Sequence, residues 1–110
     1  MTPPTQCITA LVTAPDADTA RKLAQAALIQ KLAACANIIP GVESHYWWQG
    51  KLDQSAEVLI IFKTTARLQT ALRDCVLANH PYETSEFITL PIDFGSDAYL
   101  AWIRENVARA

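Results

Sequence analysis

The stretch His45–Thr64, HYWWQGKLDQSAEVLIIFKT, decides the fold of this chain. The aromatic run Tyr46–Trp48 comes directly before Gln49-Gly50, and the apolar run Val58–Phe62 follows. An aromatic strand, a two-residue turn with glycine and a β-rich return strand together predict a β-hairpin. Because the side chains of a strand point alternately to opposite faces, the aromatic run places apolar surface on both faces beside the turn.

The predicted hairpin is too apolar and too long to be covered by its own globule. Leaving its three aromatic side chains in water would forgo about 5–10 kcal/mol of burial. A strand over residues 51–64 would span roughly 45 Å, whereas a compact chain of this length measures about 30–35 Å across. We therefore expect the hairpin to project and to be buried by another subunit. The polar run 53–55 is expected to loosen the return strand, which weakens the argument from length.

The composition indicates one ordered domain. The chain has 110 residues, of which 51% are hydrophobic and 18% charged, so residues 1–110 are expected to form a single domain with a loose arm over residues 1–5. A net charge of -2 without a basic run argues against nucleic acid or an anionic membrane as the main partner. A signal-peptide pattern and long apolar stretches are missing, and the three cysteines have no CxxC spacing, so we expect a cytoplasmic location and free thiols.

Hydrophobic periodicity predicts the remaining elements. In chain order they are a strand over residues 7–14, a helix over 16–32, a strand over 35–39 interrupted at Pro40-Gly41, the hairpin, a helix over 65–79, a strand over 86–92 and a helix from residue 95 onward. The order βαββαβ with an appended helix predicts an α+β fold of the ferredoxin-like type, an antiparallel sheet with helices on one side. Because the strands carry apolar residues on both faces, the second face is also expected to be covered by assembly. Trp102 lies off the apolar stripe of the last helix and is expected to meet a neighbour.

Several segments resemble the CutA family of divalent cation tolerance proteins. They are LVTAPD (11–16), KLAACANIIPGVES (31–44), YWWQGKL (46–52), EVLIIFKTT (57–65), HPYE (80–83), LPI (90–92) and YLAWI (99–103). The resemblance implies a ferredoxin-like homotrimer built by pairing of long hairpins, a role in tolerance of divalent metals, and copper binding. It also implies a likeness to trimeric nitrogen-regulatory signal proteins, which hold ligands in clefts between subunits.

Copper favours imidazole and thiolate ligands. The candidates in this chain are His45, His80, Cys7, Cys35 and Cys75. His80 comes first, because HPYE matches the site assigned in copper-binding members of the family. Those members have a cysteine in the first strand and a second histidine just before HPY, where this chain has Val12 and Asn79. The structural alternative for His80 is a helix stop in which the imidazole interacts with the negative end of the helix.

Lys63 is a charged residue at the end of an apolar strand, and it has two interpretations. In one, its stem lies along apolar surface while the ammonium stays in water. In the other, Lys63 lines a cleft between subunits together with Trp48, Tyr82 and Glu86.

No enzyme is expected from the motifs. The sequence has no nucleophile elbow, phosphate loop, HExxH motif or paired metal-site spacing. A thiol-redox function would need an exposed cysteine of lowered pKa, and we expect only Cys7 to qualify. The leading interpretation is a cytoplasmic trimer that binds or responds to divalent metal. The alternative is a trimeric small-molecule sensor or scaffold that holds its ligand in the cleft between subunits.

Overall fold

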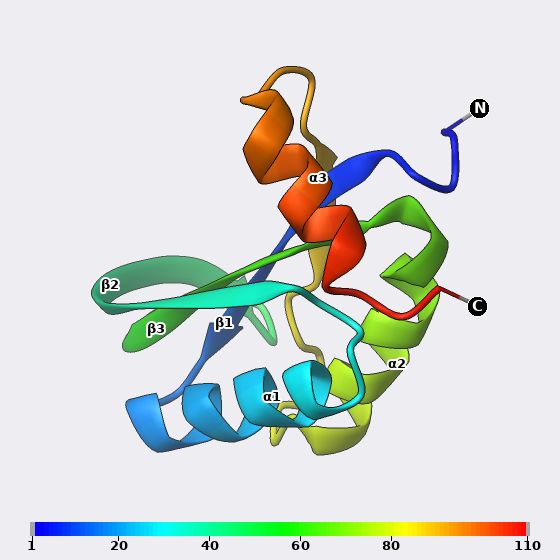
Figure 1. Ribbon diagram of the computed structural model, residues 1–110. Helices are drawn as coiled ribbons and strands as arrows, with labels where there is room; N and C mark the ends of the chain where they lie inside the picture. The colour runs from blue at the N-terminus through cyan, green and yellow to red at the C-terminus, as the bar shows by residue number, and fades with distance from the viewer. Residues whose placement is uncertain (1, 110) are drawn as a thin grey trace.

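The computed structural model describes residues 2–109, and its elements follow the predicted order (Figure 1). They are β1 (Cys7–Ala14), α1 (Ala17–Ile29), β2 (Cys35–Trp48), β3 (Lys51–Thr65), a 3-10 turn η1 (Ala66–Leu68), α2 (Gln69–Asn79), β4 (Ile88–Pro91) and α3 (Asp97–Glu105). Within the described residues the strands form a four-stranded antiparallel sheet in the order β2-β3-β1-β4. β1 therefore lies inside the sheet and β4 at its edge.

Two helices cover one face of the sheet. Figure 1 shows α1 and α2 side by side below the sheet and α3 on the opposite side. The core between the sheet and the paired helices includes Ala10, Val12, Ala20, Leu23, Ala27, Ile60, Phe62, Leu72, Cys75 and Val76. Alanines on α1 let this helix lie close to the strands, because they add little volume between the two layers.

The appended helix α3 covers the start of β1. Its Ile103 is fully buried, and the Cys7 thiol lies 3.7 Å from the Leu100 carbonyl oxygen. Only 1% of Cys7 is exposed. The expectation that Cys7 is an exposed thiol is therefore wrong, because α3 packs over it.

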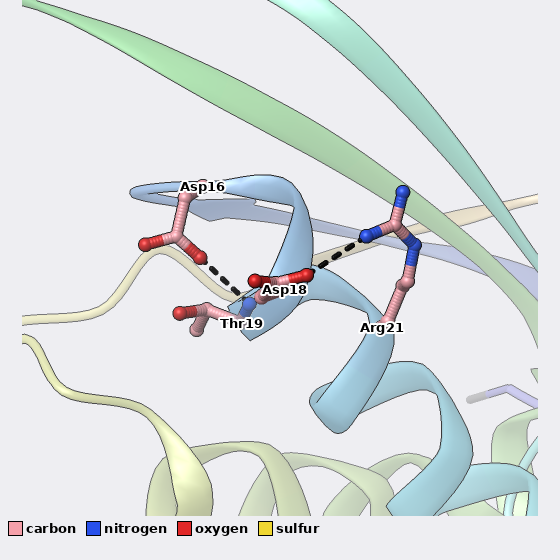
Figure 2. Close-up of polar contacts among 4 residues, drawn as sticks. All are labelled: Asp16, Asp18, Thr19 and Arg21. Carbon is pink, nitrogen blue, oxygen red and sulfur yellow. Dashed lines mark hydrogen bonds and ion pairs between the residues drawn. The ribbon is translucent and has the colours of Figure 1, made fainter.

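Helix α1 begins at a side-chain cap. The Asp16 carboxylate accepts a hydrogen bond from the Thr19 backbone N–H at 2.7 Å (Figure 2). This bond satisfies an N–H group that has no partner within the helix, and it lowers the pKa of Asp16. In the same turn, Arg21 donates to Asp18 at 2.9 Å, an exposed ion pair of small energetic weight.

β2 and β3 form the predicted hairpin. The turn residues Gln49 and Gly50 have φ of 50° and 77°, the pair of positive angles that defines a type I′ turn. Residues 53–55 pair with 44–46, so β3 runs unbroken and the expected loosening is wrong. The hairpin lengthens the molecule, which measures 43 × 26 × 24 Å (Figure 1).

Pro40-Gly41 forms the predicted irregularity within β2. The pairing with β3 shifts between Ile39 and Val42, and Gly41 has a φ of 85°. This is a β-bulge, which lets β2 bend where proline offers no N–H to the ladder.

Some element boundaries differ from the predicted ones. α1 ends at Ile29 and not at residue 32, and Lys31 then takes a positive φ of 57°. The second helix was predicted to start at residue 65, but the 3-10 turn η1 comes first and Thr65 makes no side-chain cap there. α2 starts at residue 69. β4 starts at residue 88 and not 86, because its ladder with β1 spans only four residue pairs.

The amino-terminal arm has no helix or strand in its described part, but it is attached to the body. The Pro4 carbonyl accepts a hydrogen bond from the Arg67 backbone N–H at 3.0 Å. The Thr5 carbonyl accepts one from the Arg104 guanidinium at 2.9 Å.

The sheet face turned away from α1 and α2, called here the open face, is apolar. The side chains that alternate onto it include Leu11, Ile39, Leu59, Ile61, Ile88 and Leu90. About half of Ile88 and of Leu90 is exposed, whereas Trp47, which is 72% exposed, lies on the other face of the hairpin. In the described chain this apolar surface is therefore left open to solvent. Within residues 2–109 no helix is both long enough and apolar enough to span a membrane.

Candidate functional site

A groove with a volume of about 890 Å³ lies where the hairpin meets the loop that precedes β4. Its lining includes Thr13 from β1, Tyr46 and Trp48 from β2, Asp53, Ser55 and Glu57 from β3, and Tyr82, Thr84 and Glu86 from the loop. Three separate segments of the chain thus supply the groove, and only the fold brings them together.

The two-residue period of the strands puts several of these side chains on one wall. Tyr46 pairs with Asp53 across the hairpin, and Glu57 lies four residues further along β3 on the same face. The Tyr46 hydroxyl lies 3.1 Å from Ser55 Oγ, which fixes the phenol against the neighbouring strand. This wall continues the open face, so the groove and the uncovered apolar surface are adjacent.

Glu57 and Tyr82 form the most buried polar contact of the groove. The Tyr82 hydroxyl donates to Glu57 Oε2 at 2.9 Å, and only 9% of Glu57 is exposed. Burial raises the pKa of Tyr82 to about 12, and the hydrogen bond to Glu57 and the charge of that carboxylate add to the effect. The phenol therefore stays protonated at neutral pH and acts as a donor to the carboxylate.

Glu86 extends the negative surface. Burial raises the pKa of Glu86, and the negative charge of Glu57 raises it further. The Glu57 carboxylate thus makes the charged form of Glu86 less favourable. A cation bound in this groove would favour the charged form of Glu86.

His80 is fixed by hydrogen bonds on both ring nitrogens. Nε2 lies 2.7 Å from the Thr13 carbonyl oxygen, and Nδ1 lies 3.2 Å from the backbone N–H of Tyr82. A carbonyl can only accept and a backbone N–H can only donate, so Nε2 carries the proton and the Nδ1 lone pair is occupied. The ring, of which 9% is exposed, connects the loop to β1 and leaves no lone pair free for a metal.

The other candidate metal ligands are scattered. His45 lines the groove but pairs with Glu43 at 2.7 Å on the exposed hairpin. Cys75 packs in the core, and burial raises the pKa of its thiol. The Cys35 thiol lies 3.5 Å from the Asn37 side-chain oxygen. Within residues 2–109, no three His, Cys, Asp or Glu side chains are close enough to hold a metal ion.

The structure places three of the four predicted cleft residues on this groove. Trp48, Tyr82 and Glu86 line it, whereas Lys63 does not. Lys63 lies further along β3, opposite Cys35. Its ammonium donates to the Asn37 side-chain oxygen. Whether the groove lies between subunits stays a prediction.

The sequence prediction missed Glu57, the most buried carboxylate of the groove. A signal was present, because Glu57 directly precedes the apolar run 58–62 and is a charged residue inside a buried strand. Such a residue is rarely buried without a partner. The partner Tyr82 lies 25 residues away in sequence, so only the fold reveals the pair.

Comparisons with known proteins agree with one another. Residues 8–106 match the family model of the CutA1 divalent ion tolerance protein. The divalent-cation tolerance protein CutA of Salmonella newport is 46% identical over 102 residues, which cover 93% of this chain and 89% of the relative.

Solved structures have the same fold along nearly their whole length. The CutA1 of Oryza sativa superimposes with a TM-score of 0.92 at 42% identity, covering 96% of this chain and 99% of that one. The divalent cation tolerance protein of Thermus thermophilus gives 0.90 at 41%, covering 93% and 99%. A protein from Archaeoglobus fulgidus named periplasmic divalent cation tolerance protein CutA gives 0.89 at 37%, covering 93% and 99%. By the family model, by sequence and by structure, this chain belongs to the CutA1 family of divalent ion tolerance proteins.

Proposed function

We propose that this protein is a cytoplasmic, non-enzymatic trimer of the ferredoxin-like type that binds divalent cations in the groove of Glu57, Tyr82 and Glu86. The observation that carries the proposal is Glu57, a residue that is nine-tenths buried yet lines an open groove. Burial of a carboxylate is costly unless hydrogen bonds or cations compensate for it. Tyr82 supplies one hydrogen bond, and a cation would supply the rest.

The donor set favours a hard cation over copper. The lining residues supply carboxylate and hydroxyl oxygens, which suit magnesium, calcium or manganese. Copper was expected at His80, but that imidazole has no free lone pair, and the cysteines lie outside the lining. A copper site at His80 therefore does not fit this arrangement.

Assembly completes the proposed site. Within residues 2–109 one chain does not bring three metal-ligating side chains together, so the remaining ligands come from water or from a neighbouring chain. The groove adjoins the open face and the exposed Trp47, which are the surfaces that we propose a neighbouring chain covers. A cation bound there would couple binding to assembly.

Isothermal titration with Mn²⁺, Mg²⁺ and Cu²⁺ tests the proposal. We expect saturable binding of a hard cation, and we expect Glu57→Gln to weaken it about tenfold, because the amide keeps the shape and removes the charge. Glu105→Gln, which removes one charge from the exposed end of α3, is the matched control and should leave the affinity unchanged.

Two results would contradict the proposal. One is the absence of saturable binding by any of the ions. The other is equal binding by the wild-type protein and Glu57→Gln. Copper binding that disappears in His80→Gln while manganese binding persists would instead support the imidazole site.

The alternative function, a sensor of a small organic molecule, is favoured by the size of the groove. A volume of about 890 Å³ is much larger than one ion requires and lies within the range of small-molecule sites.

A further inference from the structure

We infer that the groove also binds organic ammonium compounds of the polyamine type, with an ammonium group at Glu57 and the alkyl chain along the rings of Tyr46, Trp48 and Tyr82. This inference rests on the proposal that the groove is a ligand site, and it names a chemical class that the groove fits.

The first argument is the charge of the lining. Its ionisable side chains are Glu43, Asp53, Glu57, Glu83 and Glu86, together with His45 and the tyrosines. Neither lysine nor arginine is among the described residues that line it. Phosphates and carboxylates would meet repulsion here without a compensating cation. The ligand class is therefore cationic.

The second argument is the aromatic surface beside the carboxylates. Tyr46, Trp48 and Tyr82 all line the groove, and an ammonium group is attracted to the face of such rings. A small hydrated metal ion gains little from them, whereas an alkylammonium buries its methylene groups against them. Aromatic walls next to carboxylates thus favour an organic cation.

The third argument is an acceptor that no described residue uses. Tyr82 bonds to Oε2 of Glu57, and Oε1 accepts no hydrogen bond from the rest of the described chain. Among the described residues the buried side-chain oxygen without a partner is Thr65 Oγ1, so Glu57 Oε1 is open to the groove, where a donor can reach it. An ammonium group carries three N–H donors and a positive charge.

The fourth argument is the position of the acidic residues on both walls. Asp53 comes from the hairpin and Glu86 from the loop before β4, and both line the same groove. One amine would neutralise only one of them. A chain with several amines spaced by methylene groups would pair with acidic residues on both sides while its apolar stem contacts the rings.

The experiment follows the binding of spermidine to the wild-type protein by calorimetry, with glutamate as an anionic probe and Mn²⁺ as the metal probe. We expect saturable binding of spermidine and none of glutamate. Trp48→Leu should weaken spermidine about three- to tenfold, the loss expected for one aromatic face, and leave Mn²⁺ unchanged. Trp102→Leu is the matched control, because Trp102 on α3 has the same 41% exposure as Trp48 and lies outside the groove lining.

Glu57→Gln adds a second, conservative variant. It should weaken spermidine about tenfold or more, while far-ultraviolet circular dichroism and the sedimentation coefficient stay those of the wild type. A variant that binds poorly but keeps both properties has lost contacts and not its fold.

Each outcome separates this inference from the proposed function. Binding of Mn²⁺ without binding of spermidine overturns the inference and leaves the proposed function standing. Saturable spermidine binding that tolerates both Trp48→Leu and Glu57→Gln lies elsewhere on the acidic surface and also overturns it. If neither probe binds, both proposals fail.

Discussion

At the scale of single residues, the groove depends on one loop held in place by one histidine. His80 bonds to the Thr13 carbonyl of β1 and to the Tyr82 backbone N–H, and its ring centre lies 4.7 Å from that of Tyr82. These contacts present the Tyr82 hydroxyl to Glu57. Through these contacts His80 positions the phenol of Tyr82.

The Tyr82 hydroxyl should ionise at a higher pH than an ordinary tyrosine. Its pKa is raised to about 12, above the ordinary 10.0, because burial and Glu57 favour the neutral phenol. A raised pKa in the folded state means that this hydrogen bond stabilises the protein below pH 10 and is lost as the pH rises towards 12. We expect the absorbance of tyrosinate to contain a component that rises near pH 12, and Tyr82→Phe to remove it.

Tyr99→Phe is the control for this titration, because Tyr99 lies on α3 and its loss should leave the component near pH 12 in place. At neutral pH, Tyr82→Phe should also lower the free energy of unfolding by about 1–2 kcal/mol, since it leaves the Glu57 carboxylate without its donor. A single step near the ordinary tyrosine value would contradict the contact.

At the scale of elements, the hairpin turn is the feature most dependent on backbone geometry. Gly50 has a φ of 77°, and a Cβ added there would meet no atom within 4 Å. Gly50→Ala should therefore destabilise the protein through backbone strain alone, by about 1 kcal/mol. Gln49→Asn, at a φ of 50°, should be neutral or slightly stabilising because asparagine tolerates this region.

Urea denaturation at a fixed protein concentration measures both variants of the turn. An equal loss of stability in Gly50→Ala and Gln49→Asn would contradict this prediction. It would show that side-chain contacts of the hairpin turn, and not its backbone dihedral angles, determine the change in stability.

The cap of α1 gives a second prediction for an element. The bond from the Thr19 N–H lowers the pKa of Asp16 below 3.8, so its stabilising effect is present above that pH and is lost as the pH falls through the lowered value. Asp16→Ala should therefore cause a small loss of stability at neutral pH that shrinks in acid. Asp16→Asn, which keeps an acceptor, should lose less at neutral pH, and thermal unfolding at both pH values measures the difference.

The sequence predicts the elements where side-chain periodicity is strong and fails where pairing decides. β1, the turn at Gln49-Gly50 and the end of α2 at Asn79 follow from local patterns. The run 53–55 has the composition of a turn, yet pairing with 44–46 keeps it extended. Local propensity is overridden there by the ladder of the neighbouring strand.

The residues of the candidate site were predicted only in part, because strand pairing and loop position decide which of them meet. Trp48 and Tyr82 belong to motifs that resemble the family, Glu86 lies three residues after HPYE, and all three line the groove. Lys63 lies on the face of β3 that lines the groove, but too far along the strand to reach the groove. Its neighbours at that point depend on the register between β3 and β2. Glu57 is found only once the fold brings Tyr82 of the loop into contact with it.

At the scale of the whole molecule, the two faces of the sheet differ in how much apolar surface they expose. One face of the sheet is sealed by α1 and α2, whereas the open face keeps Ile88 and Leu90 about half exposed. Contiguous apolar surface of this kind marks an interaction site on a stable protein. The acidic groove lies at its border, so a neighbouring chain that covers the face would also narrow the groove.

Assembly gives the last prediction. Sedimentation equilibrium should return three times the chain mass of 12.1 kDa for the wild type. Trp47→Glu should shift the protein towards monomer, because a charge would be buried against a neighbour without a partner, at a cost of several kcal/mol. Ile29→Glu is the control: Ile29 is 82% exposed, compared with 72% for Trp47, but it lies on α1 and not on the hairpin.

The contrast between the two variants locates the interface. If exposure of an apolar side chain were enough to drive association, both glutamates would dissociate the assembly. If the hairpin is the element that a neighbour buries, only Trp47→Glu dissociates it, and the affinity of the groove for cations falls with it. A wild-type monomer that binds cations with full affinity would separate the groove from assembly and refute the coupling.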